Sequence, residues 1–365
     1  MQFKDIPGYK SVKTKLIQGV KQERVAHAQL FLGPLGSGSL PLALAYAQFV
    51  NCLEPLEDDS CGKCASCIKY EKLVHPDLHF SFPIKGAKLT SDDFLTTFRE
   101  KIIENPYLSS SEWMDALENE NSKPNIGVLE CKNILRKLGF RPYESKVKVL
   151  IMWMPEYLGK EGNTLLKFIE EPKGNTLIIM AGSDESKLLG TIVSRVQITR
   201  IPLFADEDIA ENLTKNFSIS TPQAKQLAML SQGSMHKAIG MIDFVENSYF
   251  QDFRAWLLDC YKGDMAKINE WVNKLSTFGR ESLKSFMEYG IQIVRCCLID
   301  EYELNAGRLT EKEEEFVKKL SDLLDLERTE HFYNLLNKAH YGIERNGNAK
   351  IMIFNLSLGI RTVPN

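Results

Sequence analysis

The chain has 365 residues, a length that favours two to three domains. It is 44% apolar and 25% charged, ordinary values for a globular protein with a core, and 45 basic against 48 acidic residues give a net charge of −3. The charge balance gives no overall positive field for nucleic acid, and the longest apolar runs are far shorter than the roughly 18 residues of a membrane span. We expect no secretory signal, because no apolar run follows the charges of the opening segment. We expect a cytoplasmic protein without membrane contact, whose eight cysteines are thiols or metal ligands and not disulfides.

The first two hundred residues alternate short apolar runs with amphipathic stretches. The pattern predicts strands over 28–32, 78–82, 147–152, 176–181 and 197–201, with helices over 39–51, 129–138 and 163–171, the last closed by Pro172. Strands separated by helices indicate a parallel sheet covered on both faces. Residues 86–125 interrupt this rhythm as an insertion with one or two helices and no clear strand, and they suggest no function.

Beyond residue 202 the strand signals stop. Helical patterns cover 206–215 and 221–230, and from about 246 the apolar period is close to 3.6 residues. Three apolar stripes are predicted to pack in a bundle: Phe253, Trp256, Leu257 and Cys260; Phe286, Met287, Ile291 and Val294; and Phe316, Val317, Leu320 and Leu324. The predicted fold is α/β plus all-α, with an α/β domain over 1–202, a small helical domain over 203–245 and a helical bundle over 246–365.

A glycine-rich segment follows the first strand and precedes a helix. Its glycines Gly33, Gly36 and Gly38 have the spacing of a phosphate-binding loop, but Ser39 stands at the lysine position and Leu40 at the position of the magnesium-binding hydroxyl. Serine cannot replace that charge, leucine cannot bind a hard cation, and the strand over 147–152 ends without a carboxylate. The segment is either a tight turn alone or a weak residual nucleotide site; an active ATPase with a non-standard loop is the alternative.

Four cysteines lie close together in the sequence with the spacing C-x8-C-x2-C-x2-C: Cys52, Cys61, Cys64 and Cys67. Four thiolates with a glycine at position 62 for a tight turn favour a closed, structural zinc site. Reduced free thiols and an iron–sulfur cluster are the alternatives, and His75 and His79 lie near enough to be considered as ligands. The remaining cysteines, Cys131, Cys260, Cys296 and Cys297, fall in apolar helical patterns and are predicted to be core thiols.

Several motifs in a specific order resemble the AAA+ clamp-loader ATPases of bacterial DNA polymerase III. They are His27-Ala28 before the loop, the four-cysteine insert after the first helix of the α/β domain, 163–167 (NTLLK) running to 170–172 (EEP), and 187–195 (KLLGTIVSR), with an opening segment FKDIPGYKSVKTKL of similar type. The resemblance covers 1–85 and 126–245. It implies an AAA+ parallel-sheet domain, a helical lid domain and a C-terminal collar domain.

The same resemblance implies partners and a role. The family forms a hetero-pentamer with gamma or tau ATPase subunits and a delta subunit, which opens a sliding clamp and places it on primed DNA. Here Gly182 stands where an active member has a polar γ-phosphate sensor, and His236 stands where it has a lid arginine, so the resemblance is to a member that does not hydrolyse ATP.

Ser194 and Arg195 are kept although the chain's own site is incomplete. An arginine at a subunit edge can reach the γ-phosphate held by the next subunit and stabilise the charge that develops in phosphoryl transfer. The resemblance therefore implies that Arg195 is an arginine finger acting in trans, and a local salt bridge is the alternative. A zinc-dependent DNA-binding module is a further alternative for the whole chain, although its acidic net charge argues mildly against this.

Overall fold

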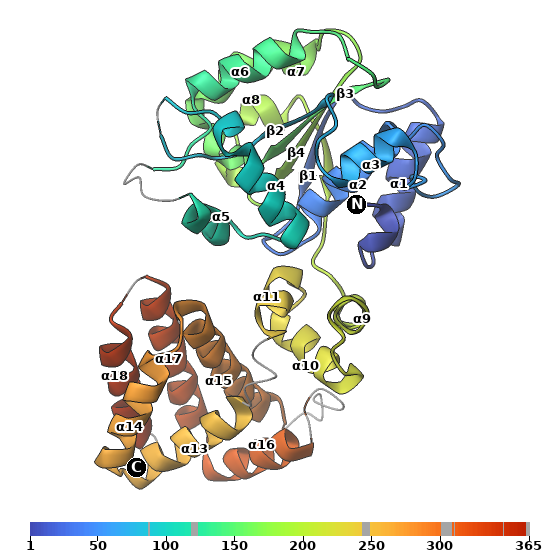
Figure 1. Cartoon of the computed structure of the whole chain (residues 1–365). Helices are drawn as coiled ribbons and strands as arrows, with labels where there is room; N and C mark the ends of the chain where they lie inside the picture. Colours follow the sequence, from blue (N-terminus) through green and yellow to red (C-terminus); the bar gives the residue numbers. More distant parts are fainter. Residues whose placement is uncertain are drawn as a thin grey trace. The chain divides into compact units, whose positions relative to one another are not determined.

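The computed structural model describes residues 1–86, 88–117, 123–242, 249–300, 309, 311–345 and 347–362. They form two compact units, one of Met1–Asp208 with Gly233–His236 and the other of Ile209–Gln232 with Lys237–Asn365. The predicted fold class is confirmed: the first unit is α/β with a parallel sheet, and every element described in the second unit is a helix (Figure 1). The division into three domains stays a prediction, and its boundary near 245 lies outside the described residues.

The sheet of the first unit is parallel throughout. Its strands are β1 (Ala28–Leu32), β2 (Leu78–Ser81), β3 (Lys148–Trp153), β4 (Thr176–Gly182) and β5 (Gln197–Arg200), in the order β2-β3-β4-β1-β5. All five predicted strands are confirmed, each within one residue at either end. The order reverses at β1, because β4 lies on one side of it and β5 on the other.

The helices of the first unit follow the predicted alternation. They are η1 (Phe3–Asp5), α1 (Lys10–Lys21), α2 (Ser39–Val50), α3 (Ala65–Glu71), η2 (Ser91–Phe94), α4 (Leu95–Glu104), α5 (Ser110–Ala116), α6 (Val128–Leu138), η3 (Pro155–Leu165), α7 (Leu166–Glu170), η4 (Glu185–Lys187) and α8 (Gly190–Val193), and α9 (Asp206–Phe217) begins at its boundary. The predicted helix over 163–171 is α7 continuing the 3-10 segment η3, and it ends before Pro172 as expected.

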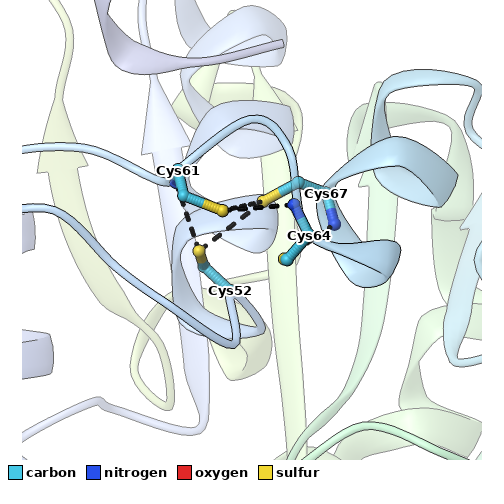
Figure 2. Close-up of side chains that lie close together, drawn as sticks. All are labelled: Cys52, Cys61, Cys64 and Cys67. Atoms are coloured by element: carbon cyan, nitrogen blue, oxygen red, sulfur yellow. Dashed lines mark hydrogen bonds between the residues drawn. The ribbon is translucent and has the colours of Figure 1, made fainter.

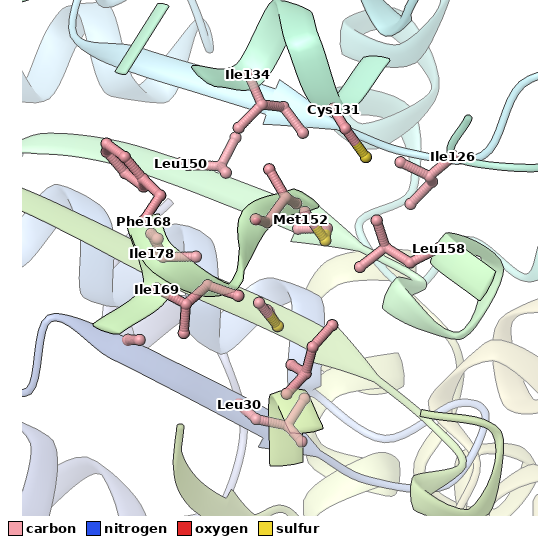
Figure 3. Packing of buried hydrophobic residues seen from close by; sticks show 14 of the residues in the cluster. Leu30, Ile126, Cys131, Ile134, Leu150, Met152, Leu158, Phe168, Ile169 and Ile178 are labelled. Carbon is pink, nitrogen blue, oxygen red and sulfur yellow. The ribbon is translucent and has the colours of Figure 1, made fainter. Parts of the chain in front are cut away.

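Both faces of the sheet are covered, which gives a dry core. Alternate strand residues such as Leu150, Met152 and Ile178 face α6 and α7, where Ile134 and Phe168 pack against them (Figure 3). The opposite face packs against α2, which contacts β1, β3 and β4. Strands buried on both faces lose the polar alternation of an exposed sheet, which is why β1, β3 and β4 appear as largely apolar runs in the sequence, although Gln29 lies within β1.

The insertion near 86–125 has a core of its own. The described part holds η2, α4 and α5 and no strand, as predicted, and its aromatic rings pack on the end of the sheet. Trp113 is fully buried edge-on against Phe82 and Phe98, and its Nε1 donates to the carbonyl of Pro83 at 2.8 Å. The insertion is therefore an integral part of the α/β unit.

The second unit contains α10 (Thr221–Ser231), α13 (Tyr249–Lys262), α14 (Met265–Ser276), α15 (Arg280–Asp300), α16 (Glu311–Leu323), α17 (Leu326–Glu344) and α18 (Ala349–Thr362), while α11 (Met235–Gly240) begins in the first unit. Phe253, Trp256 and Phe286 meet at its centre with ring centroids 5.8–5.9 Å apart, and Cys260, Cys296 and Cys297 are buried as predicted. An apolar groove of about 410 Å³ lies between α13, α16 and α17. Among the described residues, no helix is both long and apolar enough to span a membrane.

Candidate functional site

The glycine loop lies where the strand order reverses. β1 ends at Leu32, residues 33–38 turn, and α2 begins at Ser39. The Gly33 amide donates to the Gly182 carbonyl at the end of β4, at 3.1 Å. Ligands of open α/β sheets bind at this kind of edge, outside the carboxyl ends of the strands, so the loop occupies the place where a nucleotide would be held.

The chain's own atoms crowd the loop glycines. Gly36 has φ +85°, and a Cβ there would stand 1.8 Å from the Ser234 Oγ; its carbonyl accepts from the Met235 amide at 3.0 Å. A Cβ on Gly33 would stand 2.4 Å from the Ile201 carbonyl oxygen. Positive φ and close approach both require glycine, so packing within this unit alone is sufficient to explain these residues.

The loop offers little of the chemistry that binds phosphate. Leu40 is buried with 4% exposure, and Pro34 and Pro41 carry no N–H to donate. The cavity beside the loop has a volume of only about 40 Å³, against the roughly 300 Å³ or more typical of small-molecule pockets. The insertion forms part of its wall, because Pro106, Tyr107, Leu108 and Ser110 line it together with the loop, β3 and Gly182–Ser183.

The strand ends next to the loop carry no metal-binding acid. β3 ends in Trp153, as predicted, and the nearby carboxylate of Glu156 is engaged elsewhere: its Oε1 accepts from the Ser183 hydroxyl at 3.1 Å and the Asp184 amide at 2.9 Å. A Cβ on Gly182 would lie 3.1 Å from that oxygen. Gly182, predicted to replace a polar sensor, therefore lets Glu156 approach the chain after β4.

The four predicted cysteines converge on one point. Cys52 follows α2, Cys61 and Cys64 lie on the connecting loop, and Cys67 lies in the first turn of α3 (Figure 2). All four Sγ atoms lie within 4.8 Å of one another, and the Cys67 Sγ is 3.6 Å from that of Cys52 and 3.9 Å from that of Cys61. A tetrahedron with Zn–S bonds of about 2.3 Å has sulfur–sulfur edges of about 3.8 Å, so the cluster fits a zinc ion.

Backbone amides point at these sulfurs. The Cys61 amide donates to the Cys52 Sγ at 3.2 Å, the Cys64 amide to the Cys61 Sγ at 3.3 Å and the Cys67 amide to the Cys64 Sγ at 3.4 Å. Burial raises the pKa of the Cys61 thiol, but amide donors from Lys63 and Cys64 outweigh it and lower that pKa to about 6. The metal-binding thiolate is thus favoured at Cys61, whereas burial raises the pKa of the Cys52 and Cys67 thiols.

Hydrogen bonds attach the cysteine loop to the rest of the unit at two places. The Asn51 side chain donates to the Tyr70 hydroxyl at 2.6 Å and to the Val147 carbonyl at 2.7 Å, and accepts from the Val147 amide at 3.2 Å. On the other side, the carboxylate of Asp59 accepts from the amides of Phe3 and Lys4 at 3.1 and 2.9 Å. The loop is thus fixed between β3 and the first residues of the chain.

The two nearby histidines are not part of the cluster that the structure describes. His75 is buried, its Nδ1 accepts from the Asp77 amide at 3.1 Å, and its Nε2 lies 3.2 Å from the Glu144 carboxylate. Burial, with Lys137 and Lys148 nearby, lowers the pKa of His79 to about 4. Neither His75 nor His79 is among the residues whose ligand atoms converge at the sulfur cluster.

Arg195 follows α8 at the exposed edge of the unit. Its Nε pairs with Glu170 at the end of α7, and its Nη1 donates to the Thr191 carbonyl at 2.8 Å and to the Ser194 hydroxyl at 3.2 Å. A third of the Arg195 side chain and about half of the Glu170 side chain are exposed. The local salt bridge considered from the sequence is present, and an exposed pair of this kind contributes only about 0–1 kcal/mol.

Two residues of this region were not identified from the sequence. One is Asn51, which directly precedes Cys52 in the sequence. The other is Tyr9, whose hydroxyl accepts from the Gly38 amide at 3.1 Å. Gly8 and Tyr9 both have positive φ, which is unusual for two successive residues, but this is visible only in the structure. The part of the insertion that lines the loop cavity likewise carried no recognisable motif.

The parallel sheet, the glycine loop and the helical second unit define a chain of the P-loop α/β class joined to an α-helical domain. A sequence model of the family described as "DNA polymerase III, delta subunit" matches residues 8–205. The chain belongs to this family of clamp-loader subunits.

Curated relatives of this chain are DNA polymerase III subunits of several kinds. The DNA polymerase III subunit gamma of Buchnera aphidicola is 25% identical over 251 residues, which are 67% of this chain and 59% of the relative. The subunit delta' of Bacillus subtilis is 26% identical over 68% of this chain and 62% of its own length. The subunit tau of the same organism is also 26% identical, over 66% of this chain and 37% of its own length. The match thus covers between about a third and three fifths of these relatives.

Among solved structures, a gamma subunit-related protein of Thermotoga maritima aligns over 97% of this chain and 99% of its own, with a TM-score of 0.38 and 14% identity.

Proposed function

We propose that this chain is the delta-prime kind of clamp-loader subunit, which takes part in loading the sliding clamp on primed DNA without hydrolysing ATP. The observation that carries the proposal is the glycine loop. Ser39 and Leu40 replace its two catalytic side chains, no carboxylate ends β3, and a cavity of about 40 Å³ remains beside it. A loop of this composition and size supports a subunit with a degenerate ATP site.

Arg195 would give this subunit its catalytic role. Arg195 lies at an exposed edge, and its ion pair with Glu170 costs little to break. Its guanidinium can therefore exchange Glu170 for a phosphate that a neighbouring subunit binds. An arginine supplied in trans can raise the rate of phosphoryl transfer by a factor of about 10³–10⁵. We propose Arg195 as that finger, with Ser194 beside it.

Zinc is the metal that we propose for Cys52, Cys61, Cys64 and Cys67. The sulfur–sulfur distances of 3.6 and 3.9 Å and the amide donors support four thiolates around one ion. Four protein ligands leave no open coordination position for a substrate, so the ion would have a structural role.

The proposed partners are the gamma or tau ATPase subunits and a delta subunit in a hetero-pentamer, and through it the clamp and primed DNA, in the cytoplasm. The groove of the helical unit supports a contact with the collar helix of a neighbouring subunit. Leu258, Tyr261 and Leu323 line it with exposures of 43, 54 and 60%, and exposed apolar patches of this kind mark protein contacts.

The test measures ATP turnover by the chain alone and by the complex reassembled with the active ATPase subunits of its host, with DNA and clamp. We expect no turnover by the chain alone, and a stimulated rate in the complex that falls by at least tenfold with Arg195→Ala. Arg200→Ala is the matched control, because Arg200 lies on the neighbouring β5 and pairs with Glu185 at 2.8 Å. Turnover by the isolated chain, or equal rates for the two variants, would overturn the proposal.

A further inference from the structure

We infer that Tyr9 acts as a plug that blocks phosphate binding at the glycine loop. Its hydroxyl accepts the hydrogen bond of the Gly38 amide that a phosphate oxygen would need. This inference rests on the proposed function, since it gives a second reason, besides the missing lysine, why the loop would not bind a nucleotide phosphate. It assigns Tyr9 as the residue that decides whether the loop can accept an anion.

The Tyr9 hydroxyl is held at the loop by two hydrogen bonds. It accepts from the Gly38 amide at 3.1 Å and donates to the Pro202 carbonyl at 2.8 Å. Gly38 directly precedes the position of the missing lysine, and in a phosphate-binding loop such amides cradle the phosphates. Its donor is therefore already used within the chain.

The ring of Tyr9 also covers Gly38 sterically. A Cβ on Gly38 would stand 2.7 Å from the Tyr9 Cε2, so only a glycine lets the ring lie so close. The ring packs on Phe204 with centroids 4.6 Å apart, and Tyr107 of the insertion meets Phe204 from another direction at 5.7 Å. Three segments distant in sequence thus fix the plug in place.

The backbone of Tyr9 also has an unusual conformation. Tyr9 has φ +56° and ψ 30°, a left-handed conformation that a tyrosine rarely adopts, and it directly precedes α1. Such strain persists where surrounding contacts over-determine it. Burial raises the pKa of Tyr9, so that its hydroxyl keeps the proton it donates to Pro202.

The first test measures the Gly38 amide directly. Hydrogen exchange is followed by NMR in protein labelled with ¹⁵N-glycine, of which the chain has 23 residues. We expect Tyr9→Phe to speed exchange at Gly38 at least tenfold with unchanged overall stability. Tyr107→Phe, which removes a hydroxyl from the same aromatic cluster, should leave it unchanged. Unaltered exchange at Gly38 in Tyr9→Phe would overturn the inference.

The second test measures binding of magnesium-ADP by calorimetry after the lysine is restored. We expect Ser39→Lys alone to bind no better than the wild type, and the pair Ser39→Lys with Tyr9→Ala to bind at least tenfold tighter. Equal affinity of the single and double variants, both folded, would overturn the plug and leave the proposed function intact. ATP turnover by the wild-type chain would instead contradict the proposed function.

Discussion

Asn51→Leu is expected to release the cysteine loop from the sheet. In the wild type Asn51 is 3% exposed and joins Tyr70 of α3 to Val147 before β3 through three hydrogen bonds. Leucine has a similar volume but can make none of them. The Val147 carbonyl still accepts a hydrogen bond from the Ser145 hydroxyl at 2.8 Å. The groups left without a hydrogen-bond partner are therefore the buried Tyr70 hydroxyl and the Val147 amide.

The cost follows from those two groups. An unsatisfied buried donor or acceptor costs about 1–3 kcal/mol, and the half-buried Val147 amide lies at the low end of that range, so the free energy of unfolding should fall by about 2–4 kcal/mol. Urea denaturation in the presence of zinc measures it. Asn175→Ala is the control, since the Asn175 side chain is exposed and donates to the Lys146 carbonyl at 3.3 Å; we expect a change below about 0.5 kcal/mol. Equal losses in the two variants would refute the reasoning.

Three further predictions concern the metal, the loop and pH. We expect elemental analysis to find one zinc per chain in the wild type and none in Cys67→Ser, while the circular dichroism of the sheet persists; a wild type purified without metal loss and lacking zinc would contradict the site. Gly36→Ala should destabilise the chain by about 1–3 kcal/mol, because φ is +85° and the new methyl meets Ser234; thermal unfolding unchanged from the wild type would contradict this. The pKa of His79 in the folded chain is about 4, below its value of 6.5 when unfolded, so the unfolded chain binds the extra proton and stability should fall by about 3 kcal/mol as pH drops from 6.5 to 4. His79→Gln should flatten that part of the pH profile, and an unchanged slope would exclude His79 as its source.

The fold could be predicted because its signals are local. The central strands are covered on both faces and therefore form continuous apolar runs, while Gly33 and Pro172 mark a strand end and a helix end. The cysteine cluster was equally accessible, since four ligands within sixteen residues need only one loop and one helix turn to meet.

The rest depends on contacts between distant residues that leave no periodic pattern. Tyr9 meets Gly38 across 29 residues of sequence, and Asn51 meets Val147 across 96. Each such hydrogen bond depends on how several elements are arranged in space. The residues next to it in the sequence therefore give no pattern from which it could be predicted. The same holds for Tyr107, whose place beside the loop depends on how the whole insertion packs.

These contacts also explain why the loop needs its glycines independently of any phosphate chemistry. A Cβ on Gly33 would strike the Ile201 carbonyl, one on Gly36 the Ser234 side chain, and one on Gly38 the Tyr9 ring. Each glycine is thus required by the chain's own packing, whether or not a nucleotide binds. Lysine and a hydroxyl at positions 39 and 40 have no such second role, because Ser39 is partly exposed and Leu40 fills the core. In the proposed non-hydrolysing subunit, serine and leucine at those two positions would remove phosphate and magnesium binding, while the glycine spacing of an ATPase loop stays because packing requires it.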